Sequence, residues 1–148
     1  MTPFRISFHV PGDPVPKQRA RANPGGKGYY APRPRGSKRL SYMEYRELVQ
    51  VQLICALDDQ GIRPDYRDRV FPKISWGLTV RAKLGVGDFD NVAGSVADAC
   101  QGFLYKDDKQ VLEAHQYLER VGPKALRGVD VECWTLDASG GKALERAR

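Results

Sequence analysis

The chain has 148 residues, of which 41% are hydrophobic and 28% charged, and this composition fits a single soluble globular domain and excludes a largely disordered chain. No apolar run reaches the eighteen residues that a membrane helix needs, and the N-terminal residues lack a signal-peptide pattern. We therefore expect a cytoplasmic protein without a membrane span. Three widely spaced cysteines without a Cys-x-x-Cys pair are expected to be buried reduced thiols, at Cys55, Cys100 and Cys133.

The net charge of +6 is concentrated in one segment near the N-terminus. Residues 14–43, here called the basic segment, contain eight of the 24 Lys and Arg residues and none of the 18 Asp and Glu residues. Tyr29, Tyr30 and Tyr42 lie within it. Cations mixed with aromatic rings suit a surface that binds phosphates and stacks on bases, although a solvated loop explains a basic run equally well.

A strand is expected before the basic segment and a helix after it. Apolar residues alternate with polar ones over residues 4–10, which is typical of a half-buried strand, and Pro11–Pro14 would end it. Within the basic segment, Asn23–Gly26 forms a turn signal. Ser41 and Glu44 form a capping-box pattern that begins a helix, which would end near Gly61. The helix would bury a stripe consisting of Tyr45, Leu48, Val49, Gln52 and Ala56.

The clearest strand of the sequence leads into a pair of aspartates. Apolar residues alternate without a break over residues 74–84, and glycines follow at positions 85 and 87. Asp88 and Asp90 come next at a spacing of two, so both carboxylates would point the same way in extended backbone. A helix over residues 92–103 is expected, with Asp90 as its N-cap and Gly102 near its end.

A second pair of carboxylates follows that helix at Asp107 and Asp108. Gathered carboxylate oxygens suit a hard divalent cation that acts on phosphate, so the chain is a candidate nuclease. Each half also has a plain structural explanation, because aspartate caps helices without any catalytic role and a charged turn can contain Asp-Asp.

The C-terminal part completes the predicted fold. Residues 111–121 are ambiguous between helix and strand, whereas residues 126–136 alternate as a half-buried strand. The predicted class is α/β or α+β, with a small mixed sheet and helices packed against it. A single domain is expected over residues 1–136, followed by a polar tail over residues 137–148.

Taken together, the two aspartate motifs resemble a known family. The order Asp88-x-Asp90-Asn91, a short helix carrying Asp98, then Lys106-Asp107-Asp108-x-Gln110-Val111 is similar to the RusA family of Holliday junction resolvases. The Pro-rich and basic stretch over residues 14–21 also looks like that family's opening. The resemblance covers approximately residues 4–136.

The resemblance implies a small homodimer that binds four-way DNA junctions and nicks two strands of like polarity, using Mg²⁺ with Mn²⁺ as a substitute. It places the metal-binding catalytic aspartates at Asp88, Asp90 and Asp108, and it implies a strand over residues 111–121. Supporting roles fall to Asn91, which would orient a carboxylate or cap the helix, and to Asp107 and Lys106. Asp98, one helix face away, is a further candidate carboxylate. We also expect alternating Lys17, Arg19 and Arg21 to contact DNA phosphates, which position a duplex without reading its sequence.

One position departs from the family pattern. Members typically carry a lysine four residues after the second aspartate, where this chain has Gly94. A cation there would stabilise the charge that develops on the phosphate. Candidates to replace it are Lys83, Lys106, Lys109 and Lys17.

Three functions therefore compete: a junction endonuclease, a branched-DNA-binding module of the same fold that does not cut, and a metal-dependent phosphoesterase for small substrates. The third leaves the basic segment unexplained, because a small phosphate ester needs only a few cations. The sequence favours the endonuclease, acting in DNA recombination and repair.

Overall fold

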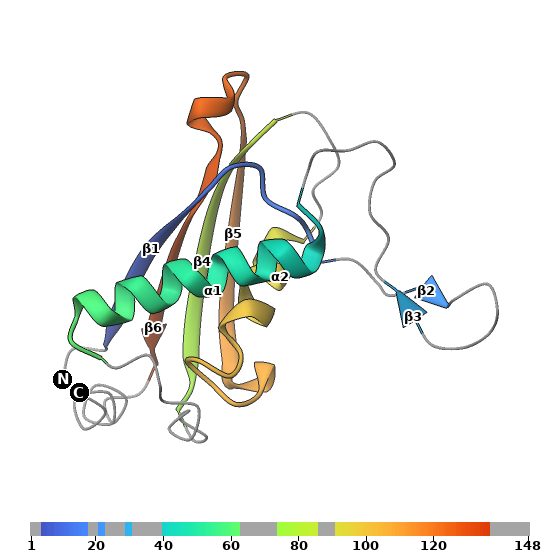
Figure 1. Ribbon diagram of the computed structural model, residues 1–148. Coiled ribbons are helices and arrows are strands. Elements are labelled where there is room, and N and C mark those ends of the chain that lie inside the picture. The colour runs from blue at the N-terminus through green and yellow to red at the C-terminus, as the bar shows by residue number, and fades with distance from the viewer. Residues whose placement is uncertain are drawn as a thin grey trace.

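The computed structural model describes residues 4–17, 21–22, 29–30, 40–62, 74–85 and 91–136, and it shows an α+β arrangement of two layers (Figure 1). A mixed four-stranded sheet forms one layer, and two helices cover one of its faces. The sheet consists of β1 (Arg5–Pro11), β4 (Trp76–Leu84), β5 (Val111–Arg120) and β6 (Gly128–Thr135), and the helices are α1 (Tyr42–Asp59) and α2 (Val92–Cys100). A separate two-stranded sheet pairs β2 (Arg21–Ala22) with β3 (Tyr29–Tyr30). The predicted fold class is confirmed.

The strand order β1-β6-β4-β5 puts a parallel pair at one edge of the sheet. The pairs β1·β6 and β6·β4 are antiparallel, whereas β4 and β5 run parallel. Parallel neighbours need a crossover between them, and here α2 provides it. The crossover matters for function because both aspartate motifs lie on it, one before α2 and one after.

The core lies between the helices and one face of the sheet. Residues alternate between buried and exposed along β1, and in the register of the sheet Phe8 is opposite Val131, which in turn is opposite Val80. These apolar side chains face the helices. On the other face the strands carry polar residues, as in antiparallel sheets that have one side in water.

Helix α1 begins as the sequence predicted. The Ser41 hydroxyl accepts a hydrogen bond from the Glu44 backbone, and the Glu44 carboxylate accepts one from the Ser41 backbone. Gly61 follows the helix with a positive φ of 76°, a conformation that suits glycine. The predicted buried stripe was only partly right. The buried residues of α1 are Tyr45, Val49, Leu53 and Leu57, of which the sequence predicted only the first two, and the predicted Leu48 and Ala56 pack at the margin of the core.

Helix α2 is shorter than predicted and is capped by a different residue. Its N-cap is Asn91, whose side chain accepts a hydrogen bond from the Gly94 backbone at 2.8 Å, whereas the sequence favoured Asp90. The helix ends at Cys100, and Gly102 follows with a positive φ of 89°. A helical pattern through Phe103 overestimated the length because the last apolar residues belong to the turns that follow.

The structure settles the ambiguous C-terminal half. Residues 111–120 form strand β5, as the family resemblance implied, and β6 alternates as predicted. Buried Cys100 and Cys133 fit the expectation for thiols, but Cys55 lies exposed on α1, so that expectation was wrong for one of the three. In the ranges described here, no helix is both long and apolar enough to cross a membrane.

Candidate functional site

The loop that carries the first aspartate motif is held firmly where it leaves β4. The carbonyl of Gly85, the first residue after the strand, accepts a hydrogen bond from Arg120 Nη1 at 2.7 Å. The Gly85 amide donates to Asp13 Oδ1 at 3.4 Å. Side chains from β5 and from the segment after β1 therefore fix both backbone groups of this residue.

Arg127 packs against the same glycine. Its Nη1 pairs with Asp13 Oδ2 at 3.0 Å, and its Nη2 donates to the carbonyl of Gly122 at 3.0 Å. A Cβ on Gly85 would lie 2.7 Å from both terminal nitrogens of Arg127, so a glycine is needed for the guanidinium to fit. The side chains of Arg127 and Asp13 are only 16% and 22% exposed, so this ion pair is screened less by water than a surface pair.

The other end of the loop is held at the first turn of α2. The carbonyl of Asn91 accepts a hydrogen bond from the backbone of Lys17 at 3.0 Å. Next along the chain, the Ala93 amide donates to Gln116 Oε1 on β5 at 2.8 Å. Asp88 and Asp90 belong to residues 86–90 between these two anchors, and that stretch lies outside the described residues. In the sequence, both aspartates therefore lie between two backbone segments that hydrogen bonds hold in place, at Gly85 and at the start of α2.

Asp98, the carboxylate on α2, already has partners on both oxygens. Lys17 Nζ lies 3.2 Å from its Oδ1, and the Tyr42 hydroxyl donates to its Oδ2. Burial, followed by the hydrogen bond to Asp98, raises the pKa of Tyr42, so this hydroxyl stays a neutral donor at physiological pH. Lys17 and Tyr42 therefore engage both oxygens of this carboxylate.

The second aspartate motif opens a short 3-10 helix, Asp108–Gln110, directly before β5. Asp107 is its N-cap, accepting from the Lys109 backbone at 2.9 Å, and this hydrogen bond is the main cause that lowers the pKa of Asp107. Gln110 completes the turn by accepting from the backbones of Lys106 and Asp107. Asp107 and Asp108 are both exposed, and Asp107 is the one that caps this turn.

Tyr105 connects this motif to α2. Its hydroxyl donates to the carbonyl of Ala97, and its pKa is raised mainly by burial, with smaller contributions from neighbours that include Asp98 and Asp108. Gln101, the C-cap of α2, also donates through Nε2 to the carbonyl of Lys106 at 3.3 Å. The structure thus brings the second motif to the helix that the first motif precedes.

The donor chemistry of the predicted metal site fits Mg²⁺. Asp88, Asp90 and Asp108 offer hard carboxylate oxygens, the ligands that this cation prefers. Within the described ranges no three His, Cys, Asp or Glu side chains gather as a metal site, and two of the three predicted ligands fall outside those ranges. The metal-site prediction therefore stays a prediction.

The predicted DNA contacts lie partly within the described residues. Lys17 is described and its side chain is 42% exposed. Arg21 is in β2, where its backbone pairs with Tyr30 of β3, and Arg19 lies outside the described residues. The turn signal at residues 23–26 also lies outside them, between the two paired strands.

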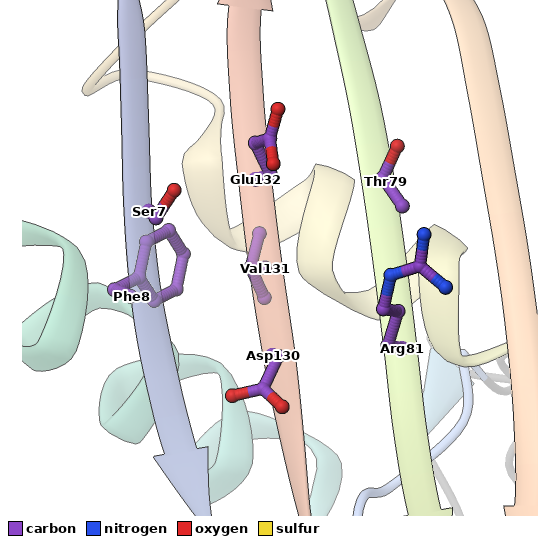
Figure 2. A pocket seen from close by; sticks show the side chains of 7 residues that line it. All are labelled: Ser7, Phe8, Thr79, Arg81, Asp130, Val131 and Glu132. Atoms are coloured by element: carbon purple, nitrogen blue, oxygen red, sulfur yellow. The ribbon is translucent and has the colours of Figure 1, made fainter.

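A cavity of about 270 Å³ lies on the opposite face of the sheet (Figure 2). Figure 2 shows Thr79 and Arg81 of β4 beside Asp130 and Glu132 of β6, with the helices behind the strands. The acidic groups are already paired, Asp130 with His9 and Glu132 with Arg5. The cavity is separated from α2 by the sheet, so it is not part of the site.

Sequence reasoning missed residues that hold the site in place, among them Asp13, Tyr42, Arg120 and Arg127. No local signal could have identified them. Asp13 is part of a turn pattern in the sequence, and its partner Arg127 lies 114 positions away. Only the paired register of the strands brings such residues together.

Comparison with known proteins identifies one family. The family model described as endodeoxyribonuclease RusA matches residues 11–132, a range that includes both aspartate motifs and the basic segment. Among curated proteins no relative matches the chain.

Proposed function

The chain belongs to the endodeoxyribonuclease RusA family, and from that premise we propose that it is a Mg²⁺-dependent nuclease that resolves Holliday junctions by paired, symmetric nicks. The observation that carries the proposal is the family match across residues 11–132 together with a loop that is anchored on both sides of Asp88 and Asp90. Rigid support for catalytic side chains is what phosphoryl transfer requires, because its catalysis is mostly positioning and electrostatics.

In this proposal the three aspartates would hold the cation, and other residues would hold the aspartates. Mg²⁺ bound by Asp88, Asp90 and Asp108 would neutralise charge on the scissile phosphate and activate water. Gly85 and Asn91 fix the ends of the first motif, and Gln110 fixes the turn of the second. Asp107 caps that turn and Lys106 contributes its backbone amide, so both act as supports.

Branched DNA is the proposed substrate because the cations are spread along a segment. Lys17, Arg19 and Arg21 would contact phosphates on one arm of a four-way junction, which positions the duplex without reading its sequence. Binding should then weaken steeply as salt rises. Action on DNA, together with reduced thiols, favours the cytoplasm.

A homodimer is part of the proposal, since symmetric nicks need two sites related by a two-fold axis. Strand β5 supports it. It lies at the edge of the sheet, runs ten residues, and leaves Leu112, Tyr117 and Leu118 exposed at 69%, 51% and 47%. Natural proteins seldom leave a long edge strand with apolar side chains uncovered, and a second copy running antiparallel would cover it.

The test is a cleavage assay on a synthetic four-way junction beside linear duplex of the same sequence, with Mg²⁺ or Mn²⁺. We expect paired nicks by the unchanged protein, and no nicks but retained junction binding by Asp90→Asn, which keeps the side chain's size and removes its charge. Cutting of both substrates alike would contradict junction resolution.

Gly94 supports one second candidate, a branched-DNA-binding module that does not cut, since the family pattern has a lysine there. This alternative predicts tight junction binding without nicks even in Mn²⁺. It also predicts that Asp90→Asn changes neither binding nor biological effect.

A further inference from the structure

One face of α2 carries Asn91, Gly94 and Asp98 at spacings of three and four residues, so the three positions follow one another along the helix. Gly94 in the middle contributes no side chain. Lys17 contacts this face at both ends. Its backbone amide donates to the Asn91 carbonyl at 3.0 Å, and its ammonium lies 3.2 Å from Asp98 Oδ1. The backbone of Lys17 therefore contacts α2 at Asn91, directly after Asp90 in the sequence. Its ammonium lies on the helix face where Gly94 has no side chain.

The ammonium is held in place yet remains accessible. Asp98 is fixed in turn by the hydroxyl of Tyr42, the first residue of α1. The side chains of Lys17 and Asp98 keep 42% and 24% of their surface exposed, so an incoming phosphate could reach this cation. Residues 14 and 15, just before it, are buried, which fixes the backbone at its root.

We propose that Lys17 is the cation of the nuclease site, that its ammonium contacts the phosphate being cut, and that Asp98 and Tyr42 are the residues that position it. This inference rests on the proposed function and deepens it, because Lys17 would touch the scissile phosphate and not a distant one. The assignment follows from contacts between described residues, and it names a residue separated from the aspartates by more than seventy positions of sequence.

In the hydrolysis, water oxygen bonds to phosphorus and its proton passes to solvent. The bond from phosphorus to the leaving sugar oxygen breaks, that oxygen keeps the electron pair, and it takes a proton from solvent. Lys17 gains and loses no proton; its positive charge stabilises the negative charge that grows on the phosphate and leaving oxygens.

Lys83 is less well placed than Lys17. It is exposed on β4, where its neighbours Ala82 and Leu84 are buried toward the helices, so Lys83 points to the opposite face of the sheet from α2. Its neighbour on that face, Arg81, is visible in Figure 2 with the helices behind the strand. Lys83 therefore serves as a matched control: the same residue type, exposed, but on the far side of the sheet.

The experiment measures single-turnover cleavage of a four-way junction at saturating protein, so that affinity does not limit the rate. Lys17→Met keeps an unbranched side chain of similar length and removes its charge. We expect this variant to cut about ten- to a hundred-fold more slowly. Lys17→Arg should keep the pair with Asp98 and most of the activity. Lys83→Met should cut within about twofold of the unchanged protein. Junction binding in EDTA, which needs no catalysis, should stay saturable for Lys17→Met.

A swap within the face of α2 gives the sharpest test. In the Lys17→Met background, Gly94→Lys places an ammonium four residues before Asp98, a spacing at which the two side chains meet, and should restore much of the lost rate. A Cβ at position 94 would lie 2.5 Å from Asn91 Oδ1 and displace that side chain, so Gly94→Ala in the same background is the control. It should restore nothing.

The assignment would be overturned if Lys17→Met cut at the unchanged rate, or if Gly94→Ala restored as much activity as Gly94→Lys in the Lys17→Met background. An inactive unchanged protein beside an active Gly94→Lys variant would also overturn the role of Lys17 while upholding the nuclease site. If the unchanged protein and Gly94→Lys both failed to cut any junction, the proposed function itself would fail.

Discussion

At the scale of single residues, a few side chains decide how the loop with Asp88 and Asp90 leaves the sheet. Gly85 has its amide held by Asp13, its carbonyl held by Arg120, and its bare Cα covered by the guanidinium of Arg127. None of these residues belongs to the predicted catalytic set. They matter because a shift of about 1 Å at the root of a catalytic loop can cost a large factor in rate.

The first prediction concerns that glycine. In Gly85→Ala the added methyl would collide with the Arg127 guanidinium and move that guanidinium away from Asp13. We therefore expect the free energy of unfolding to fall by about 1–3 kcal/mol and junction cleavage to be slower. Urea unfolding checks the stability. Gly122→Ala is the control, because nothing lies within 4 Å of its added Cβ, and it should change stability by no more than about 0.5 kcal/mol. Equal effects at the two glycines would contradict the role given to Arg127.

At the scale of elements, α2 links the parts of the site. The first aspartate motif precedes it, Asn91 caps it, Asp98 on it binds both Lys17 and Tyr42, and Tyr105 bonds to its Ala97 carbonyl. The contacts of Lys17 and Tyr42 also bring the two flanks of residues 18–41 to a single carboxylate. One short helix thereby fixes the start and the end of most of the basic segment.

The second prediction follows from the cap. Asn91→Ala removes the acceptor for the Gly94 amide and should lower stability by about 1 kcal/mol, while Asn91→Asp keeps an acceptor and should lose much less. Chemical denaturation of the three proteins measures the difference. Hydrogen exchange should speed up in the first turn of α2 for Asn91→Ala alone. If alanine and aspartate behaved alike, the cap would not be what stabilises this end of the helix.

At the scale of the whole molecule, the two edge strands of the sheet differ in how much of their surface is exposed. Strand β1 alternates cleanly and ends at Pro11, whereas β5 is exposed along nearly its whole length. The exposed edge lies at the same side of the sheet as α2, since Gln116 of β5 bonds to the first turn of that helix. A partner paired along β5 would therefore lie next to the candidate site.

The third prediction tests this edge as the proposed dimer interface. Leu118→Lys places a charge on an apolar position of the exposed edge and should turn a dimer into a monomer, with little change in the monomer's own stability because the side chain is half exposed. Sedimentation velocity measures the oligomeric state. Leu126→Lys, at a leucine that is also about half exposed and lies in the 3-10 helix Lys124–Leu126, should leave the dimer intact. Dimers of unchanged stability for both variants would place the interface elsewhere.

The sequence alone determined the elements whose signals are local. Alternation over residues 74–84 and 126–136 predicted two strands because each has one buried face, and the pair Ser41 and Glu44 predicted the start of α1 because a capping box is closed within four residues. The order and spacing of the aspartates predicted the family, which the match over residues 11–132 confirms. All of these signals are complete within short stretches of chain.

The tertiary structure decided what depends on contacts between distant residues. Residues 111–120 carry no clear period because β5 lies at an exposed edge, and only its pairing with β4 makes it a strand. The same holds for the site: Asp13 meets Arg127, and Lys17 and Tyr42 meet Asp98, across 114, 81 and 56 positions of chain. Such pairs form only when the strands pair in the observed register and α2 crosses over as observed. That arrangement is favoured by the packing of the whole core, and no single segment of the sequence carries enough of this free energy to reveal it.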